Sequence, residues 1–116
     1  MADDPDPADV FALLDDEYAR SILAATSQQP MTATELSEQC EMSLSTVYRR
    51  TDTLEETGLL ETQTELDTQG NHRDRYRARL QRLTVELDDG AYEVTLTTES
   101  LTHEFANVFT DLWEGL

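Results

Sequence analysis

Two helix-start signals lie close together in this 116-residue chain, and they constrain its fold more than any other feature. Thr32 is followed at the third position by Glu35, which is the pattern of a capping box. Ser43 is a second capping residue, and only a short break separates it from the first helix. Gly58 supplies the left-handed residue that commonly follows a helix. The sequence therefore predicts two short helices joined by a tight turn, the second one ending near Thr57.

The predicted helix 43–57 has one face for a protein core and one face for a partner. Apolar residues and a threonine recur at helical spacing, whereas hydroxyls and arginines occupy the remaining positions. The residues predicted to be buried are Leu44, Val47, Thr51 and Leu54. The residues predicted to point outward are Ser45, Thr46, Arg49 and Arg50, with Tyr48 at the border.

After this helix the hydrophobic period changes to two, which predicts strands. Residues 60–66 and 73–80 alternate on either side of the turn-forming segment 67–71, as in a β-hairpin with a polar tip. A second strand pair, 83–87 and 92–96, flanks an Asp-Asp-Gly turn. The predicted fold class is α+β: a three-helix core, a hairpin wing, further C-terminal strands and a terminal helix.

Both ends of the chain have distinct patterns. Residues 1–7 are acidic and proline-containing, which predicts a disordered lead. Residues 8–98 form one predicted domain, and residues 99–116 form a predicted terminal helix with a broad apolar stripe. The stripe suggests an isologous dimer, although it is also compatible with a helix that caps the domain core. The predicted interface residues are Val10, Phe11, Leu14, Leu101, Phe105, Val108, Phe109, Leu112 and Trp113.

The order of these elements is that of a winged helix-turn-helix. The run Ser-x-Ser-Thr-Val-x-Arg, beginning at Ser43, and the Gly-Leu-Leu step at Gly58 resemble the ArsR-like winged-helix regulators. The resemblance covers about Leu13 to Leu80 and implies a transcriptional regulator that binds double-stranded DNA as a dimer. It also implies an effector, whose identity the sequence leaves open. Tyr48 and Arg50 differ from the residues frequent in that family, so no base preference is carried over.

Alternate arginines on the predicted wing strand provide a second basic element. Arg73, Arg75, Arg77 and Arg79 form a ridge that suits DNA phosphates, or that pairs with Glu61 and Glu65 of the neighbouring strand. His72, at the wing tip, contacts phosphate in one interpretation and is a solvated loop residue in the other. The complete predicted DNA-contact set is Thr32, Thr34, Ser43, Ser45, Thr46, Tyr48, Arg49, Arg50, His72, Arg73, Arg75 and Arg77.

The net charge of −17 opposes DNA binding at first sight. The chain has 25 acidic residues, eight arginines and no lysine, a composition that resembles proteins of halophilic archaea. In molar salt the Debye length is only about 3 Å, so a dense carboxylate surface is tolerated. An ordinary acidic protein is the other interpretation. Seven of the eight arginines fall between Arg49 and Arg82, so the positive charge is concentrated on the predicted helix and wing.

The remaining chemistry is sparse. The single Cys40 cannot form an internal disulfide, which favours a cytoplasmic protein; it is a redox switch or a buried core residue. Metal sites need several thiolate or imidazole ligands, so no metal and no cofactor are expected. No catalytic motif and no apolar run of membrane-spanning length occurs, so neither an enzyme nor a membrane protein is expected.

The favoured function is that of a homodimeric, sequence-specific DNA-binding regulator. The alternative is an acidic winged-helix module that binds the transcription machinery, or a DNA mimic, without binding DNA itself. The net charge motivates this alternative.

Overall fold

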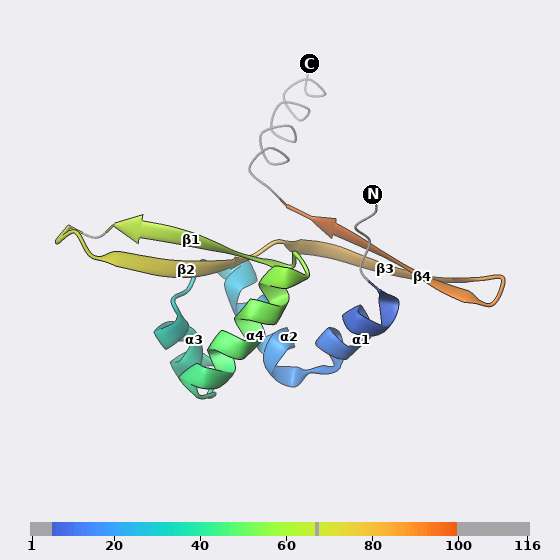
Figure 1. The fold of residues 1–116 in the computed structure, drawn as a ribbon, viewed down its shortest axis with the longest axis horizontal. Coiled ribbons are helices and arrows are strands. Elements are labelled where there is room, and N and C mark those ends of the chain that lie inside the picture. Colours follow the sequence, from blue (N-terminus) through green and yellow to red (C-terminus); the bar gives the residue numbers. More distant parts are fainter. Residues whose placement is uncertain (1–5, 67, 100–116) are drawn as a thin grey trace, which may run out of the picture.

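The computed structural model describes residues 6–66 and 68–99, and this part of the chain contains four helices followed by four strands (Figure 1). The fold is the predicted α+β winged helix-turn-helix, with α3 and α4 as the helix-turn-helix and the β1–β2 hairpin as the wing. The elements are α1 (Pro7–Asp15), α2 (Glu17–Gln28), α3 (Ala33–Gln39), α4 (Leu44–Glu56), β1 (Leu60–Leu66), β2 (His72–Ala78), β3 (Leu80–Asp88) and β4 (Ala91–Thr98).

The helix boundaries follow the capping signals in the sequence. The Thr32 backbone N–H donates to Glu35 Oε1 at 2.8 Å, and the Glu35 N–H donates to Thr32 Oγ1 at 3.2 Å, so the capping box is confirmed. Ser43 caps α4 by accepting the Thr46 N–H at 3.2 Å, and Gly58 has a φ of 80° after that helix. At the N-terminal end Asp6 caps α1, which begins at Pro7, a residue that the sequence placed in the predicted lead.

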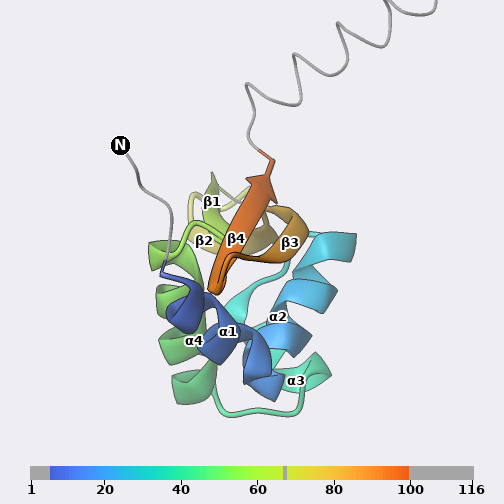
Figure 2. The same ribbon diagram turned by 90° about the vertical axis from the view of Figure 1, so that its right-hand side faces the viewer.

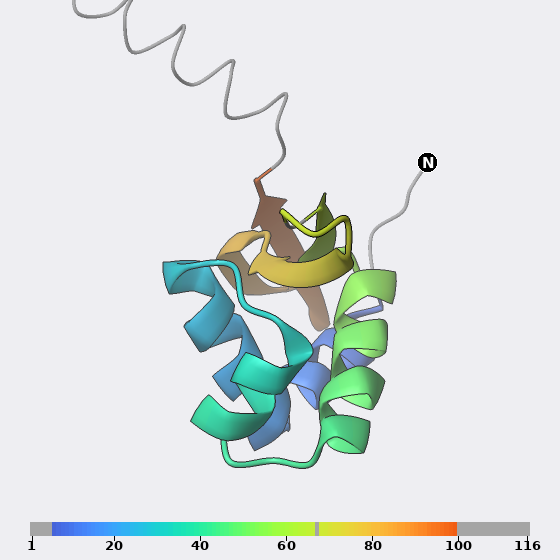
Figure 3. The same cartoon turned by 90° about the vertical axis from the view of Figure 1, so that its left-hand side faces the viewer.

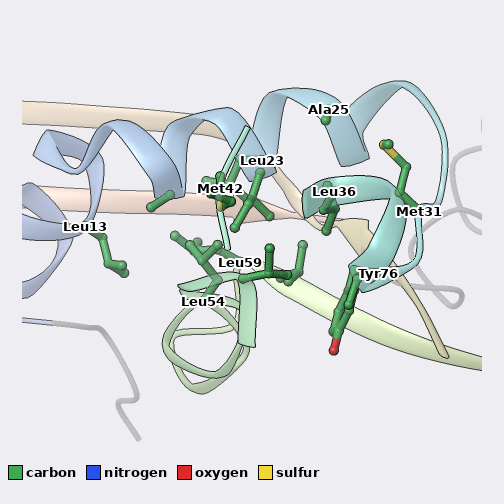
Figure 4. Packing of buried hydrophobic residues seen from close by; sticks show 14 residues of the cluster. Leu13, Leu23, Ala25, Met31, Leu36, Met42, Leu54, Leu59 and Tyr76 are labelled. Atoms are coloured by element: carbon green, nitrogen blue, oxygen red, sulfur yellow. The ribbon is translucent and has the colours of Figure 1, made fainter. Parts of the chain in front are cut away.

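The core lies where the helices meet the inner end of the wing (Figure 4). Ile22 of α2, Leu36 of α3 and Leu54 of α4 are completely buried, so each helix turns one apolar face inward. Leu59, between α4 and β1, and Tyr76 of β2 complete the cluster from the wing side. Burial of this apolar surface supplies the main free energy for holding the helices against the wing.

Leu44 corrects the sequence prediction for α4. Its side chain is 44% exposed, whereas Val47, Thr51 and Leu54 are buried as predicted. Leu44 lies in the first turn of the helix, where the core has ended. Helical spacing gives the direction of a side chain around the helix axis but not how far the core extends along it.

The wing is joined to the helical part through its second strand. Met31, just before α3, forms an isolated antiparallel bridge with Tyr76 in β2. The Met31 N–H donates to the Tyr76 carbonyl at 3.0 Å, and the Tyr76 N–H donates to the Met31 carbonyl at 2.7 Å. Burial raises the pKa of the Tyr76 phenol, in keeping with a ring packed into the core. The wing therefore has a fixed orientation relative to the start of α3.

The β3–β4 hairpin forms a separate two-stranded sheet that extends in the opposite direction from the wing (Figure 1). At the junction the Leu59 carbonyl accepts the N–H groups of Arg79 and Leu80, at 2.8 and 3.3 Å. Two views turned by 90° show the helices as one layer with both hairpins lying across one side of it (Figures 2 and 3). α1 lies beneath this second hairpin and contacts β4.

Replacing the buried core leucine of α4 tests this packing. Leu54→Ala removes a completely buried side chain, and we expect it to lower the free energy of unfolding by about 2–5 kcal/mol. Leu66→Ala is the matched control, because Leu66 is 67% exposed at the wing tip, and its effect should stay within about 0.5 kcal/mol. Urea titrations followed by circular dichroism measure both, and equal effects would contradict the assigned core.

Candidate nucleic-acid interface

The N-terminal half of α4 presents an exposed polar surface. Ser45, Tyr48 and Arg49 point away from the core and are exposed. Ser43 hydrogen-bonds to the hydroxyls of Ser45, at 3.2 Å, and of Thr46, at 2.9 Å, which gathers three hydroxyls at the helix start. A helix N-terminus with free N–H groups and hydroxyls favours anionic oxygen, and an arginine suits guanine edges.

Arg50 does not lie on that surface, which corrects the sequence prediction. Its Nε lies 2.5 Å from Asp16 Oδ2, and its guanidinium lies over the Tyr18 ring, 5.8 Å from the centroid. Asp16 follows α1 and also caps α2 by accepting the Tyr18 N–H. Arg50 therefore holds α4 against the corner between α1 and α2, and Arg49 is the arginine on the outward face.

Ion pairs neutralise much of the predicted arginine ridge on the wing. Arg75 Nε lies 2.8 Å from a Glu65 carboxylate oxygen, and its Nη1 lies 3.4 Å from Glu35 Oε1. Arg77 Nη2 pairs with a Glu99 carboxylate oxygen at 3.4 Å, and the Arg79 Nε–H donates to the Glu99 carbonyl at 2.8 Å. The pairing with Glu61 and Glu65 that the sequence left open therefore describes Arg75, which pairs with Glu65, and Arg79, whose Nε lies 4.0 Å from Glu61 Oε2. Arg77 pairs with Glu99 instead.

Arg73 differs from the other wing arginines. It is exposed, and it forms no ion pair with any residue in the described ranges. Its cross-strand neighbour Glu65 turns instead to Arg75, which lies diagonally across the hairpin. Among the arginines of α4 and the wing, those available to an external anion are therefore Arg73 on the wing and Arg49 on α4.

A cavity of about 260 Å³ brings several predicted contact residues together. It lies where the start of α3, the side of α4 and the outer part of β2 meet. Asp74 also lines it, although the sequence interpretation missed this residue, and its carboxylate accepts the Thr64 hydroxyl at 2.8 Å. The alternation of side chains along β2 could have identified Asp74, because it places this residue on the same face as His72 and Tyr76, which also line the cavity. The predicted contact residues that line the cavity are Thr32, Thr34, Tyr48, His72 and Arg73.

Glu35 connects the helix cap to the wing. The N–H of Thr32 donates to the Glu35 carboxylate, and this hydrogen bond is the main reason that the Glu35 pKa lies below its usual range. The Thr32 hydroxyl and the charges of Arg75 and Arg73 lower the pKa further. Burial acts in the opposite direction but does not prevail. Arg75 is therefore a positioning residue in this structure, because it ties the wing to α3 through Glu35.

Cys40 is a half-buried residue beside the core. Its Sγ lies 3.8 Å from the Ser21 carbonyl, and burial raises the pKa of the thiol. The uncharged thiol therefore predominates at neutral pH, which weakens the redox interpretation because the thiolate is the reactive form. Across residues 6–66 and 68–99, no three His, Cys, Asp or Glu side chains are arranged to hold a metal ion.

The predicted dimer residues divide into three groups. Val10 is completely buried within the protomer, so it offers no surface to a second copy and is withdrawn from that prediction. Leu14 packs half-buried against the core, whereas Phe11 is 39% exposed. The C-terminal members of the set, Leu101, Phe105, Val108, Phe109, Leu112 and Trp113, lie outside the described residues.

Comparison with known proteins agrees with this geometry. A family model described as a helix-turn-helix domain matches residues 13–63, from the end of α1 into β1. No curated protein matches the sequence. The matched segment contains the whole of α2, α3 and α4, so the fold and the family model define a winged helix-turn-helix protein, a class that indicates a DNA-binding regulator. In the part of the chain that the structure describes, no helix is long and apolar enough to cross a membrane.

The lowered pKa of Glu35 predicts a pH-dependent contribution to stability. A folded-state pKa below the unfolded value means that ionised Glu35 stabilises the fold. This contribution is complete above the unfolded value, near 4.5, and is lost as the pH falls through the lower folded value. We therefore expect Glu35→Gln to lower stability at neutral pH and to match the wild type in acid.

Urea titrations across this pH range measure the difference. Glu38→Gln is the control, because Glu38 is exposed on the same helix and makes none of these contacts. A deficit of Glu35→Gln that does not vary with pH would contradict the role assigned to the carboxylate.

Proposed function

We propose that this protein is a sequence-specific DNA-binding transcription regulator that acts as a homodimer. The observation that carries the proposal is the convergence of α3, α4 and the wing around one polar cavity, next to the exposed face of α4. In this arrangement α4 enters the major groove and the wing lies along the backbone. The resemblance to ArsR-like regulators supports the same arrangement.

The exposed groups divide between base reading and backbone contact. Ser45 and Arg49, on the outward face of α4, are placed to meet base edges. Arg73 and His72, at the wing, suit phosphate oxygens, and Tyr48 lines the cavity between the two elements. Glu35 and Arg75 contribute indirectly, because they hold the wing against α3.

We further propose that the protein works at molar salt, because its charge of −17 and its lack of lysine suit such a solvent. Phosphate contacts weaken as salt rises, by about −0.9 in the log–log slope for each contact. A DNA-binding protein with few unpaired arginines makes few phosphate contacts, so rising salt lowers its affinity only slightly. Base-edge contacts then carry a larger share of the binding free energy than they do in a lysine-rich regulator.

The outward arginine of α4 tests base reading. We expect Arg49→Ala to weaken binding to a selected DNA site by about 1–3 kcal/mol and to relax its sequence preference. Arg82→Ala is the charge-matched control, because Arg82 is exposed on β3, outside the proposed surface. Fluorescence anisotropy with a fragment selected from genomic DNA measures both. Equal binding by Arg49→Ala and the wild type would exclude Arg49 from the interface.

The wing arginine tests backbone contact. Arg73→Ala should weaken binding to all sequences alike and make the salt dependence shallower, by about 0.9 for each arginine removed. The measurement is the slope of log affinity against log KCl concentration. An unchanged slope would show that Arg73 meets no phosphate.

A second candidate function has an observation of its own. The ion pairs of Arg75, Arg77 and Arg79 leave the wing less basic than its sequence indicates, which favours an acidic module that binds another protein or mimics DNA. Selection of genomic fragments from low salt to molar KCl separates the two candidates. If the protein retains no DNA fragment at any of these salt concentrations, the protein-binding module is favoured.

A further inference from the structure

The β3–β4 hairpin has one entirely uncharged face. Residues paired across an antiparallel sheet point to the same side, and the register therefore places six apolar side chains together. The opposite side carries polar and charged residues, including Glu86 directly across from Glu93. The pairs on the uncharged face are Leu83 with Leu96, Val85 with Val94 and Leu87 with Tyr92.

This face is covered at its base and open at its tip. Leu96 packs against the core, whereas Val85, Leu87 and Tyr92 are 45%, 65% and 59% exposed. Phe11 of α1 continues the surface, because its ring meets the Tyr92 ring edge to face, with 6.2 Å between centroids. We call Phe11, Val85, Leu87 and Tyr92 the hairpin patch.

The hairpin patch needs a covering layer. An isolated two-stranded sheet is at best marginally stable in water and gains stability when its apolar face packs against another element. α1 supplies part of such a layer, and its Phe11 contacts Tyr92. Among the described residues, β3 and β4 pair only with each other. Contiguous exposed apolar groups of this kind mark interaction sites.

We infer that the hairpin patch is the surface on which a second copy of this chain docks, and this inference rests on the proposed function as a dimeric regulator. The patch contains no basic side chain that could pair with the phosphates of a nucleic acid. Between chains of charge −17, an uncharged face is where two copies approach with least repulsion. The hairpin also points away from the wing (Figure 1), so copies joined there leave both α4 helices accessible.

The charges around the patch give the association a characteristic salt dependence. Glu86, Asp88, Asp89 and Glu93 surround the hairpin tip, and a symmetric pairing brings two such sets together. Their repulsion is screened by salt, while burial of the apolar groups is not weakened by it. The dimer dissociation constant therefore falls as KCl rises, which is the opposite of the trend expected for DNA binding.

Sedimentation equilibrium of the full-length protein, from low salt to molar KCl, tests the inference. We expect Leu87→Thr to raise the dimer dissociation constant about tenfold or more, because each copy loses a buried leucine. Leu66→Thr is the matched control, since Leu66 is also a leucine near a hairpin tip, with 67% of its side chain exposed against 65% for Leu87. Val85→Thr is a second variant, and circular dichroism verifies that each variant is folded.

Three results would overturn the inference: a wild-type monomer at every salt concentration, equal dissociation constants for Leu87→Thr and Leu66→Thr, or a dimer that weakens with salt. A Leu87→Thr protein that is less stable but equally dimeric also overturns it, because residues 100–116 of the same chain then become the occupant of the patch.

Selection of DNA fragments by the same protein tests the proposed function independently of the dimer. A wild-type monomer that selects DNA sites removes the hairpin inference alone, whereas a patch-dependent dimer that selects none removes DNA binding alone.

Discussion

The bridge between Met31 and Tyr76 is the constraint on which the rest of the candidate interface depends. Met31 precedes the cap of α3 and Tyr76 lies within β2, so two backbone hydrogen bonds fix the wing relative to the helix-turn-helix. The ion pair between Glu35 and Arg75 repeats this connection with side chains. The polar cavity between α3, α4 and the wing exists because these links hold its walls in place.

The arginines have two different tasks in this protein. Arg20 donates to the carbonyls of Leu14 and Asp15, Arg50 pairs with Asp16, and Arg75 pairs with two glutamates. These side chains hold elements together. Arg49 and Arg73 remain directed toward solvent at the candidate interface. In an acidic chain without lysine, an arginine near carboxylates forms structural ion pairs, so the count of arginines overstates the charge available to a partner.

Local signals predicted the secondary structure well. The capping box at Thr32, the cap at Ser43 and the left-handed Gly58 act within a few residues, so the sequence alone located α3 and α4. Alternation likewise located both hairpins. The errors at Leu44 and Val10 have a different origin, because burial depends on which elements pack over a side chain, and periodicity carries no such information.

The sequence by itself determined the order of the elements, the class of fold and the concentration of arginines on the helix and wing. Only the tertiary structure decided that Arg50 faces Asp16, that Arg75 faces Glu35 and that Arg73 stays unpaired among the described residues. The physical reason is distance along the chain. Caps and turns form between near neighbours, whereas these ion pairs join residues from separate elements that meet only after the core has packed.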